Sequence, residues 1–255
     1  MSRTKFGEMD VVVAESTESM GALAASDFAA AARDLLRTLS EINVVFSGAE
    51  SQQPFHRALL RETGIPWQRI NAFGVDEFYA PGLPPESAVS AQPRRDLYRH
   101  VPLKSVNVID FAPADPEAER RRYEQLIREH PPHICCLGVG LSGHIALNEP
   151  GATNFEDRQL VRLVTVTAES KRQLSLDPNF RALPSIPDRG LTVTIPVLIG
   201  APVILVVVPF ALKAGIVAKL AQATVSPALP ASILKTLSKA RLYLDPESAA
   251  GLPQR

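Results

Sequence analysis

The chain has 255 residues, 45% of them hydrophobic and 21% charged, which is the composition of a globular protein with a sizeable apolar core. Its 27 basic and 27 acidic residues give a net charge of zero, which argues against nucleic acid or an anionic membrane as the main partner. No apolar run approaches the roughly 20 residues that cross a bilayer, and the N-terminal MSRTKFGEMD lacks the apolar stretch of a signal peptide.

Short apolar runs alternate with amphipathic or charged segments, which predicts strands separated by helices. In chain order, the predicted elements are strand 10–14, helix 19–40, strand 42–48, a helix ending near Gly64, strand 70–75, helix 115–129, strands 133–139 and 160–166, helix 168–174, strands 191–195 and 203–208, helix 213–223 and strand 241–244. Several strands are uniformly apolar, as in a parallel sheet that helices cover on both faces. We therefore predict one domain over residues 1–255 with an α/β fold: a three-layer, mostly parallel, doubly wound (Rossmann-like) sheet.

The two cysteines lie next to each other inside an apolar strand. Cys135 and Cys136 belong to the run HICCL, so they cannot join in an ordinary structural disulfide. We expect both to be buried strand residues without a catalytic role. A chain with two cysteines and no disulfide framework is typical of a reduced, cytoplasmic protein.

Polar segments directly follow four of the apolar strands. These segments are 47–53, 76–77, 140–151 and 209–213. In open parallel sheets, ligands bind beyond the carboxyl ends of the strands, where such loops meet. We therefore expect the four segments to form one cleft for a small molecule.

The glycine-rich stretch GVGLSGHIALNEPG, residues 138–151, carries the side chains best suited to catalysis. It holds one histidine, His144, and one carboxylate, Glu149, and a carboxylate that orients an imidazole serves general acid–base chemistry. Without the surrounding motif, His144 could equally be a hydrogen-bonded loop histidine, and Glu149 could be a surface carboxylate. The pair Asp76-Glu77 is in the same way compatible with charges at a turn or a helix start.

At these residues the chain resembles the glucosamine-6-phosphate deaminase/isomerase family. GVGLSGHIALNEPG is similar to the family's signature loop, G-x-G-x-D-G-H-I-A-F-N-E-P-G, and INAFGVDEFYAPGLP is similar to its N-M-D-E-Y-x-G-L-P segment. VVFSGAESQQPFHRAL stands where the family has its phosphate loop, and PSIPDRGLTVTI resembles V-P-x-x-A-L-T-V-G-I, with a strand and a lysine following. The matches run in order over essentially the whole chain, which is therefore identified as a divergent member of the glucosamine/galactosamine-6-phosphate isomerase superfamily.

The resemblance implies a sheet of the sugar-phosphate isomerase type and an amino-sugar-phosphate deaminase/isomerase. Glucosamine-6-phosphate, or a close analogue, would be converted to fructose-6-phosphate and ammonia, a reaction of N-acetylglucosamine catabolism. Asp76 would move a proton between sugar carbons 2 and 1, His144 would assist ring opening, and Glu149 would orient the imidazole. The implied partner is a small-molecule sugar phosphate, with no metal, cofactor, nucleic acid or membrane. A homo-oligomer is left open.

The resemblance also assigns residues to substrate binding. Phosphate is held by cations and by backbone N–H groups. Arg172 and Lys213 match the family's phosphate-binding arginine and lysine, with Lys171 as a second choice in place of Arg172. The other residues expected to contact substrate or phosphate are Ser47, Gly48, Ala49, Ser51, Gln52, Glu77, Gly140 and Gly143.

Two positions depart from the family pattern. Ser142 stands where the family has an aspartate that acts in ring opening, and a serine at this catalytic position brings a hydrogen bond but no charge. Glu50 places a carboxylate inside the expected anion-binding loop, S-G-A-E-S, where the family has T-G-x-T-P. Together they indicate an altered substrate: galactosamine-6-phosphate, another amino-sugar phosphate, or an open-chain sugar that needs no ring opening.

Two other functions remain as alternatives. A 6-phosphogluconolactonase-type hydrolase has the same fold, but its loop resembles G-H-T-A-S, whereas this chain has Ile145 and Asn148-Glu149-Pro150. A catalytically impaired sugar-phosphate-binding sensor would keep the pocket without turnover, and the two departures from the family pattern support it. No segment matches the allosteric site of the best-known deaminases.

Overall fold

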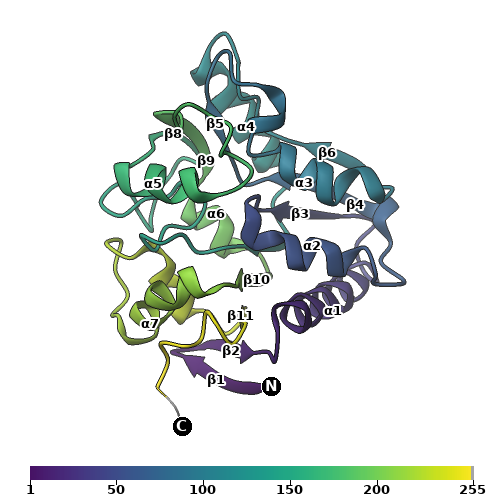
Figure 1. Ribbon diagram of the computed structural model, residues 1–255. Coiled ribbons are helices and arrows are strands. Elements are labelled where there is room, and N and C mark those ends of the chain that lie inside the picture. The colour runs from purple at the N-terminus through teal and green to yellow at the C-terminus, as the bar shows by residue number, and fades with distance from the viewer. Residues whose placement is uncertain (254–255) are drawn as a thin grey trace.

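Eight strands form the main sheet of the computed structural model, which describes residues 1–253 (Figure 1). Their order is β1-β2-β11-β10-β7-β3-β4-β6, and every neighbouring pair is parallel except β1 and β2. The strands are β1 (Ser2–Phe6), β2 (Met9–Val13), β3 (Ile42–Phe46), β4 (Ile70–Gly74), β6 (Ser105–Asn107), β7 (Ile134–Leu137), β10 (Val203–Val208) and β11 (Ala240–Leu244).

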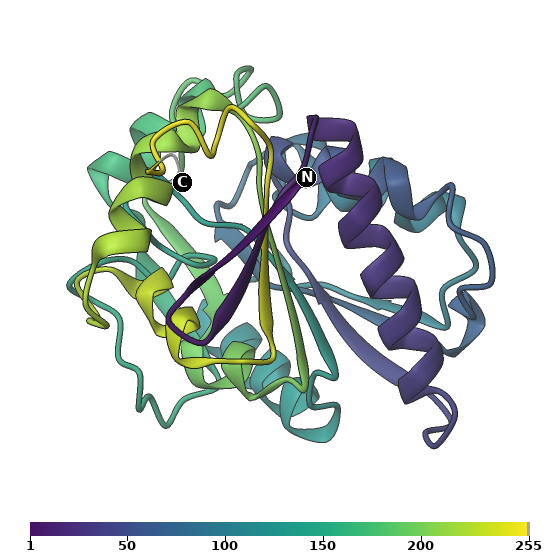
Figure 2. The ribbon, with the colours of Figure 1, turned by 90° about the horizontal axis from the view of Figure 1, so that it is seen from below.

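Helices cover both faces of this sheet, and the predicted three-layer fold is confirmed. The helices are α1 (Thr17–Leu35), α2 (Gln53–Leu59), α3 (Ala91–Asp96), α4 (Pro116–Glu129), α5 (Ala168–Leu176), α6 (Ile195–Gly200) and α7 (Ala214–Gln222). One core cluster joins the sheet to α1 and α2, and another joins it to α4, α6 and α7. Figure 2 shows α1 and α7 on opposite sides of the sheet.

The uniformly apolar strands follow directly from this double cover. Successive side chains of a strand point to opposite faces of the sheet. Val44 packs in the cluster under α1 and α2, whereas Val45 packs in the other cluster. Cys135 and Cys136 divide in the same way and are free, fully buried thiols, as expected, and burial raises the pKa of both.

Helix α2, which leads away from the β3 loop, is held by close packing on α1. A Cβ atom on Gly21 of α1 would lie 2.5 Å from the carbonyl oxygen of Pro54, so only glycine permits this approach. Ser16 caps the start of helix α1, where its side chain and that of Ser19 form a reciprocal capping box. The start of α2 and the loop before it are therefore fixed against a long, well-capped helix.

A second, three-stranded sheet corrects the predicted strand arrangement. The segments 160–166 and 191–195 were expected in the main sheet, but β8 (Val161–Thr165) and β9 (Arg189–Val193) pair antiparallel with each other. The third strand, β5 (Asp76–Tyr79), starts at the polar pair that was expected to be a loop and pairs antiparallel with β9. Only one residue separates β5 from β4, so the chain passes directly from one sheet to the other.

Besides β5, four short strands and helices were not predicted from the sequence: β1, β6, α3 and α6. Strand β1 is mostly exposed and β6 is half-buried, so neither carries a strong apolar pattern. Helices α3 and α6 have six residues each, too few for a visible helical period. Within residues 1–253, no helix combines the length and apolar character needed to cross a membrane.

Candidate active site

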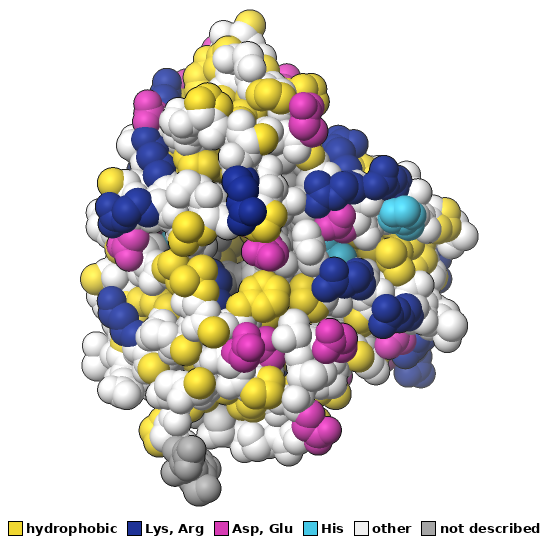
Figure 3. Space-filling model, viewed as in Figure 1, with side chains coloured by type: hydrophobic (Ala, Val, Ile, Leu, Met, Phe, Trp, Pro, Cys, Tyr) yellow, Lys and Arg dark blue, Asp and Glu magenta, His cyan; other side chains and the backbone are white. Residues whose placement is uncertain are grey.

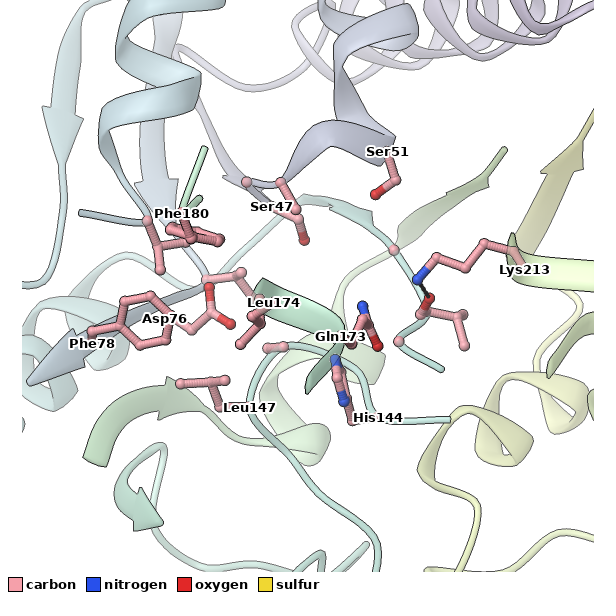
Figure 4. Close-up of a pocket in the computed structure, with 18 residues that line it drawn as sticks. Ser47, Ser51, Asp76, Phe78, His144, Leu147, Gln173, Leu174, Phe180 and Lys213 are labelled. Atoms are coloured by element: carbon pink, nitrogen blue, oxygen red, sulfur yellow. Dashed lines mark hydrogen bonds between the residues drawn. The ribbon is translucent and has the colours of Figure 1, made fainter. Parts of the chain in front are cut away.

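The four expected loops meet at one pocket beyond the carboxyl ends of β3, β4, β7 and β10 (Figure 4). Figure 3 shows a hollow near the middle of the face seen in Figure 1, bordered mainly by hydrophobic side chains. The residues that line the pocket are Ser47, Gly48, Ala49, Ser51, Val75, Asp76, Phe78, Val89, Gly138, Val139, Gly140, His144, Ala146, Leu147, Gln173, Leu174, Phe180 and Lys213. The predicted convergence of the loops is therefore confirmed.

Asp76 is the carboxylate that faces this pocket. It is the first residue of β5, and its side chain points into the pocket (Figure 4). Burial, followed by the negative charge of Glu77, raises the pKa of Asp76 to about 7. A carboxylate with a pKa near neutrality accepts and returns protons efficiently, so Asp76 suits a general base.

Glu77 does not line the pocket, contrary to its assignment as a substrate-binding residue. Strand alternation turns it away from Asp76, and its side chain is fully buried. One carboxylate oxygen accepts hydrogen bonds from the backbone N–H groups of Phe78 (2.9 Å) and Val89 (2.7 Å), and the other accepts one from Ser90 (2.9 Å). Glu77 thus holds the loop that carries Val89 in place, and its charge contributes to the raised pKa of Asp76.

His144 lies at the floor of the pocket with three oxygen atoms around its Nδ1. The Ser142 Oγ is 2.9 Å away, the Ser170 Oγ 3.0 Å and the Glu149 Oε2 3.4 Å. The Ser142 hydroxyl also donates to Glu149 Oε2 over 3.2 Å. An Nδ1–H that donates to Ser142, while Ser142 donates to Glu149, satisfies both contacts and fixes the imidazole.

Glu149 and Ser142 stand behind His144 and do not line the pocket. The Glu149 side chain is 1% exposed, and burial alone would raise its pKa. The polar neighbours of Glu149, first His144 and then Ser170 and Ser142, outweigh this effect and lower the pKa of Glu149, so its carboxylate is ionised at neutral pH. Both residues are therefore placed to orient the imidazole.

Gly140 and Gly143 shape the glycine-rich loop. A Cβ on Gly140 would lie 2.0 Å from the Nε2 of His144, so the ring packs directly on the glycine backbone. Gly143 does not line the pocket; it has φ +87°, and a Cβ there would lie 2.2 Å from a methyl group of Leu229. The structure thus gives Gly143 a conformational role in place of the expected substrate contact.

The loop after β3 forms another wall of the pocket. Ser47, Gly48, Ala49 and Ser51 line it as expected, and Ala49 has φ +83°, a conformation that non-glycine residues rarely adopt. Gln52, which was also expected to contact substrate, is fully buried below the loop, where its amide donates to Ser51 Oγ and to the carbonyl oxygen of Val207. It supports the loop from beneath.

Lys213 brings the positive charge of the pocket. It is 7% exposed, and its Nζ donates to the carbonyl oxygen of Val139 over 2.8 Å (Figure 4). Burial lowers the pKa of Lys213 to about 8, although Asp177 opposes the shift. A buried ammonium group has few competing partners, so it is well placed to bind an anion.

Arg172 lies outside the pocket, contrary to the expectation that it contacts phosphate. It is exposed on α5, whereas the next residue, Gln173, lines the pocket and accepts a hydrogen bond from the Leu141 N–H (2.5 Å). Lys171, the second choice for this role, forms an ion pair with Asp188. The arginine expected at this wall is therefore replaced by a neutral amide.

Helix α5 and the segment after it contribute residues that the sequence pattern did not indicate. Ser170 contacts His144, and Gln173 and Leu174 line the pocket together with Phe180, whose ring packs against Phe78. Ser170 and Gln173 are three residues apart and so share a helix face, which is the one signal that could have linked them. Nothing in the sequence indicates that this face covers the pocket.

Comparison with known proteins gives one family. Residues 15–243 match the family model described as glucosamine-6-phosphate isomerases/6-phosphogluconolactonase. The chain is 29% identical to a glucosamine-6-phosphate deaminase of Geobacillus sp. (strain WCH70) over 198 residues, 76% of each chain. It is 30% identical to one of Bacillus thuringiensis (strain Al Hakam) over 193 residues, 75% of this chain and 71% of the relative.

Two solved structures show the same fold. A monomeric glucosamine-6-phosphate deaminase has a TM-score of 0.82 at 25% identity, over 94% of this chain and 99% of that one. A 6-phosphogluconolactonase from Trypanosoma brucei has a TM-score of 0.76 at 15% identity, over 99% of this chain and 100% of that one. The second likeness concerns the fold alone.

Proposed function

Because the chain belongs to the family of glucosamine-6-phosphate isomerases and 6-phosphogluconolactonases, we propose that it is an amino-sugar-phosphate deaminase/isomerase. Its substrate would be glucosamine-6-phosphate or a close analogue. The observation that carries the proposal is that Asp76, with its pKa raised to about 7, lines the same pocket as His144 and Lys213. The Geobacillus and Bacillus relatives, which are named glucosamine-6-phosphate deaminases, support the same choice.

In the proposed reaction, His144 assists opening of the sugar ring by exchanging a proton with the ring oxygen. Its Nδ1 is held by Ser142 and Ser170, with the Glu149 carboxylate behind them, which keeps the imidazole in one orientation. An oriented imidazole supplies or removes a proton without first reorganising its surroundings.

Asp76 then takes the proton from carbon 2 of the open-chain aldehyde and returns it to carbon 1. As carbon 2 loses its proton, the aldehyde oxygen takes one from the substrate's ammonium group, which gives an enolamine. The proton returned to carbon 1 then leaves a hydroxymethyl group there and an iminium at carbon 2, to which water adds before ammonia leaves and the ketone forms. The overall balance is amino-sugar phosphate plus water giving ketose phosphate plus ammonia. One carboxylate suffices for both proton transfers, since the two carbons are adjacent.

The loop after β3 and Lys213 would hold the far end of the substrate. The loop offers backbone N–H groups and the Ser47 and Ser51 hydroxyls, and Lys213 is buried beside them. Donors of these kinds bind phosphate oxygens. The sugar would then span the pocket from Lys213 towards Asp76, which lie at opposite sides of the view in Figure 4 with His144 between them.

The direct test is incubation with glucosamine-6-phosphate and galactosamine-6-phosphate while ammonia and the ketose phosphate are measured. Both products should form, and they should not form with Asp76→Asn. The matched control is Asp34→Asn, because Asp34 is exposed on α1 and pairs with Arg37 of the same helix end. Hydrolysis of 6-phosphogluconolactone without ammonia release would instead identify a lactonase.

A second measurement tests the role of Asp76 more sharply. In deuterated water, the wild-type enzyme should exchange the hydrogen on carbon 2 of bound substrate, whereas Asp76→Asn should bind the sugar phosphate without exchange. Exchange at an undiminished rate in the variant would remove Asp76 from the mechanism. Binding of all the sugar phosphates without any turnover would identify a sensor.

A further inference from the structure

The end of the pocket proposed to hold phosphate is already contacted by a carboxylate of the chain itself. The backbone N–H of Glu50, in the loop after β3, donates a hydrogen bond of 3.0 Å to Oδ2 of Asp177. Asp177 directly follows α5, so a residue 127 positions away in sequence reaches this loop. An N–H group of the kind that binds a phosphate oxygen is thus already paired with a negative charge.

Asp177 is held firmly in this place. Its other oxygen, Oδ1, accepts hydrogen bonds from the backbone N–H (2.9 Å) and the side-chain amide (2.8 Å) of Asn179. The side-chain oxygen Oδ1 of Asn179 in turn accepts one from the Arg95 guanidinium (2.9 Å) on α3. Both carboxylate oxygens therefore have partners, and these tie the end of α5 to two other segments.

Glu50 adds a second carboxylate to the same hollow. Glu50 and Asp177 line a recess that continues the pocket. The residues common to the recess and the pocket are Ala49, Ser51, Gln173 and Lys213. Burial and then the charge of Asp177 raise the pKa of Glu50, while Arg181 opposes the shift. The two acids are thus close enough to repel each other.

Positive charge at this end of the site is sparse. Among the described residues that line the pocket and the recess, Lys213 is the only lysine or arginine, and Gln173 stands where Arg172 was expected. One of the Lys213 donors is engaged by the Val139 carbonyl oxygen. A phosphate dianion would therefore meet two carboxylates and one cation in the lining, with Arg181 acting on Glu50 from outside the lining, which is a poor match in charge.

We propose that Asp177 and Glu50 are specificity-determining residues that weaken the hold of this site on phosphate. With only the β3 loop and Lys213, the site would strongly prefer an amino-sugar phosphate over the same amino sugar without phosphate. The two carboxylates would make this preference weaker. This proposal rests on the proposed function for its substrate, whereas its charge argument concerns phosphate binding alone.

The first test measures the dissociation constant of inorganic phosphate by calorimetry at pH 8. Asp177→Asn removes the charge but keeps a carbonyl oxygen that can accept from the Glu50 N–H, and Glu50→Gln is the matching change on the loop. Each should tighten phosphate binding, on the order of tenfold for Asp177→Asn. Asp188→Asn is the control, because Asp188 pairs with Lys171 outside the pocket and the recess.

The second test compares kcat/KM for glucosamine-6-phosphate with kcat/KM for glucosamine. The ratio should rise on the order of tenfold in Asp177→Asn and stay unchanged in Asp188→Asn. Phosphate affinity that is unchanged or weaker in both Asp177→Asn and Glu50→Gln, with melting temperatures near wild type, would overturn the proposal. If no variant deaminates either sugar, the proposed function fails, and the phosphate titration still decides the charge argument.

Discussion

Replacing Asp76 with asparagine should stabilise the folded protein at alkaline pH while it removes the proposed base. Burial and the neighbouring Glu77 raise the pKa of Asp76 from 3.8 to about 7. The folded state therefore keeps a proton that the unfolded chain has already lost, and folding becomes less favourable as the pH rises from about 4 to 7. Above pH 7 the cost is constant, and asparagine does not incur it.

The size of the effect follows from the same shift. Between pH 5 and the raised pKa of about 7, each pH unit is worth about 1.4 kcal/mol, so the advantage of the variant over wild type should grow by about 3 kcal/mol from pH 5 to pH 8. Urea denaturation at the two pH values measures this difference. Asp34→Asn, on the exposed face of α1, should show no such growth.

The result that would refute this reasoning is an advantage of Asp76→Asn that is the same at pH 5 and pH 8. It would mean that Asp76 is ionised in the folded protein at both values and that burial does not perturb its pKa. A base with an ordinary pKa would still be ionised at neutral pH, so activity measurements alone would not reveal this. The stability measurement is therefore the more direct probe of the carboxylate's surroundings.

Three further outcomes are expected from substitutions around the pocket. Gly140→Ala should lower kcat/KM at least about 100-fold with little loss of folding stability. The new Cβ would lie 2.0 Å from the Nε2 of His144 and must displace the ring, which a crystal structure of the variant would show. Ser142→Ala should lower kcat/KM about tenfold for a cyclic substrate and less for an open-chain analogue, because it breaks the hydrogen-bonded link between His144 and the carboxylate behind it. Lys213→Met should raise KM roughly 10- to 100-fold, because it removes a charge-assisted hydrogen bond to the substrate. Arg172→Gln is the control, since Arg172 lies outside the pocket, and it should change KM less than about twofold.

Ser142 stands where the family pattern has an aspartate, so the glycine-rich loop has one negative charge fewer than that pattern. In the structure its hydroxyl contacts both Nδ1 of His144 and the Glu149 carboxylate, and Ser170 contacts Nδ1 from α5. Two neutral hydroxyls and one carboxylate therefore surround the nitrogen. No residue replaces the negative charge of the family's aspartate, but the imidazole of His144 is still held in one orientation. This arrangement is compatible with an enzyme, so the serine at position 142 is a weaker argument for a sensor.

The strand pattern of the chain determines most of the fold by itself. Runs such as those of β3, β7 and β10 are apolar at every position, and such a strand is stable only when both faces of its sheet are covered. The same pattern places polar loops at the carboxyl ends of parallel strands, which lie along one edge of a sheet. Asp76, His144 and Lys213 could therefore be expected in one pocket.

The antiparallel sheet and the distant contributions to the pocket were decided by tertiary structure alone. Whether Asp76 ends a loop or begins β5 depends on its pairing with Thr192, and nothing local specifies that partner. Ser170 and Asp177 reach the site only because α5 packs over it. A sequence pattern reports which face of an element is buried, but not which distant element covers it. That choice is made by packing and hydrogen bonding between segments far apart in the chain.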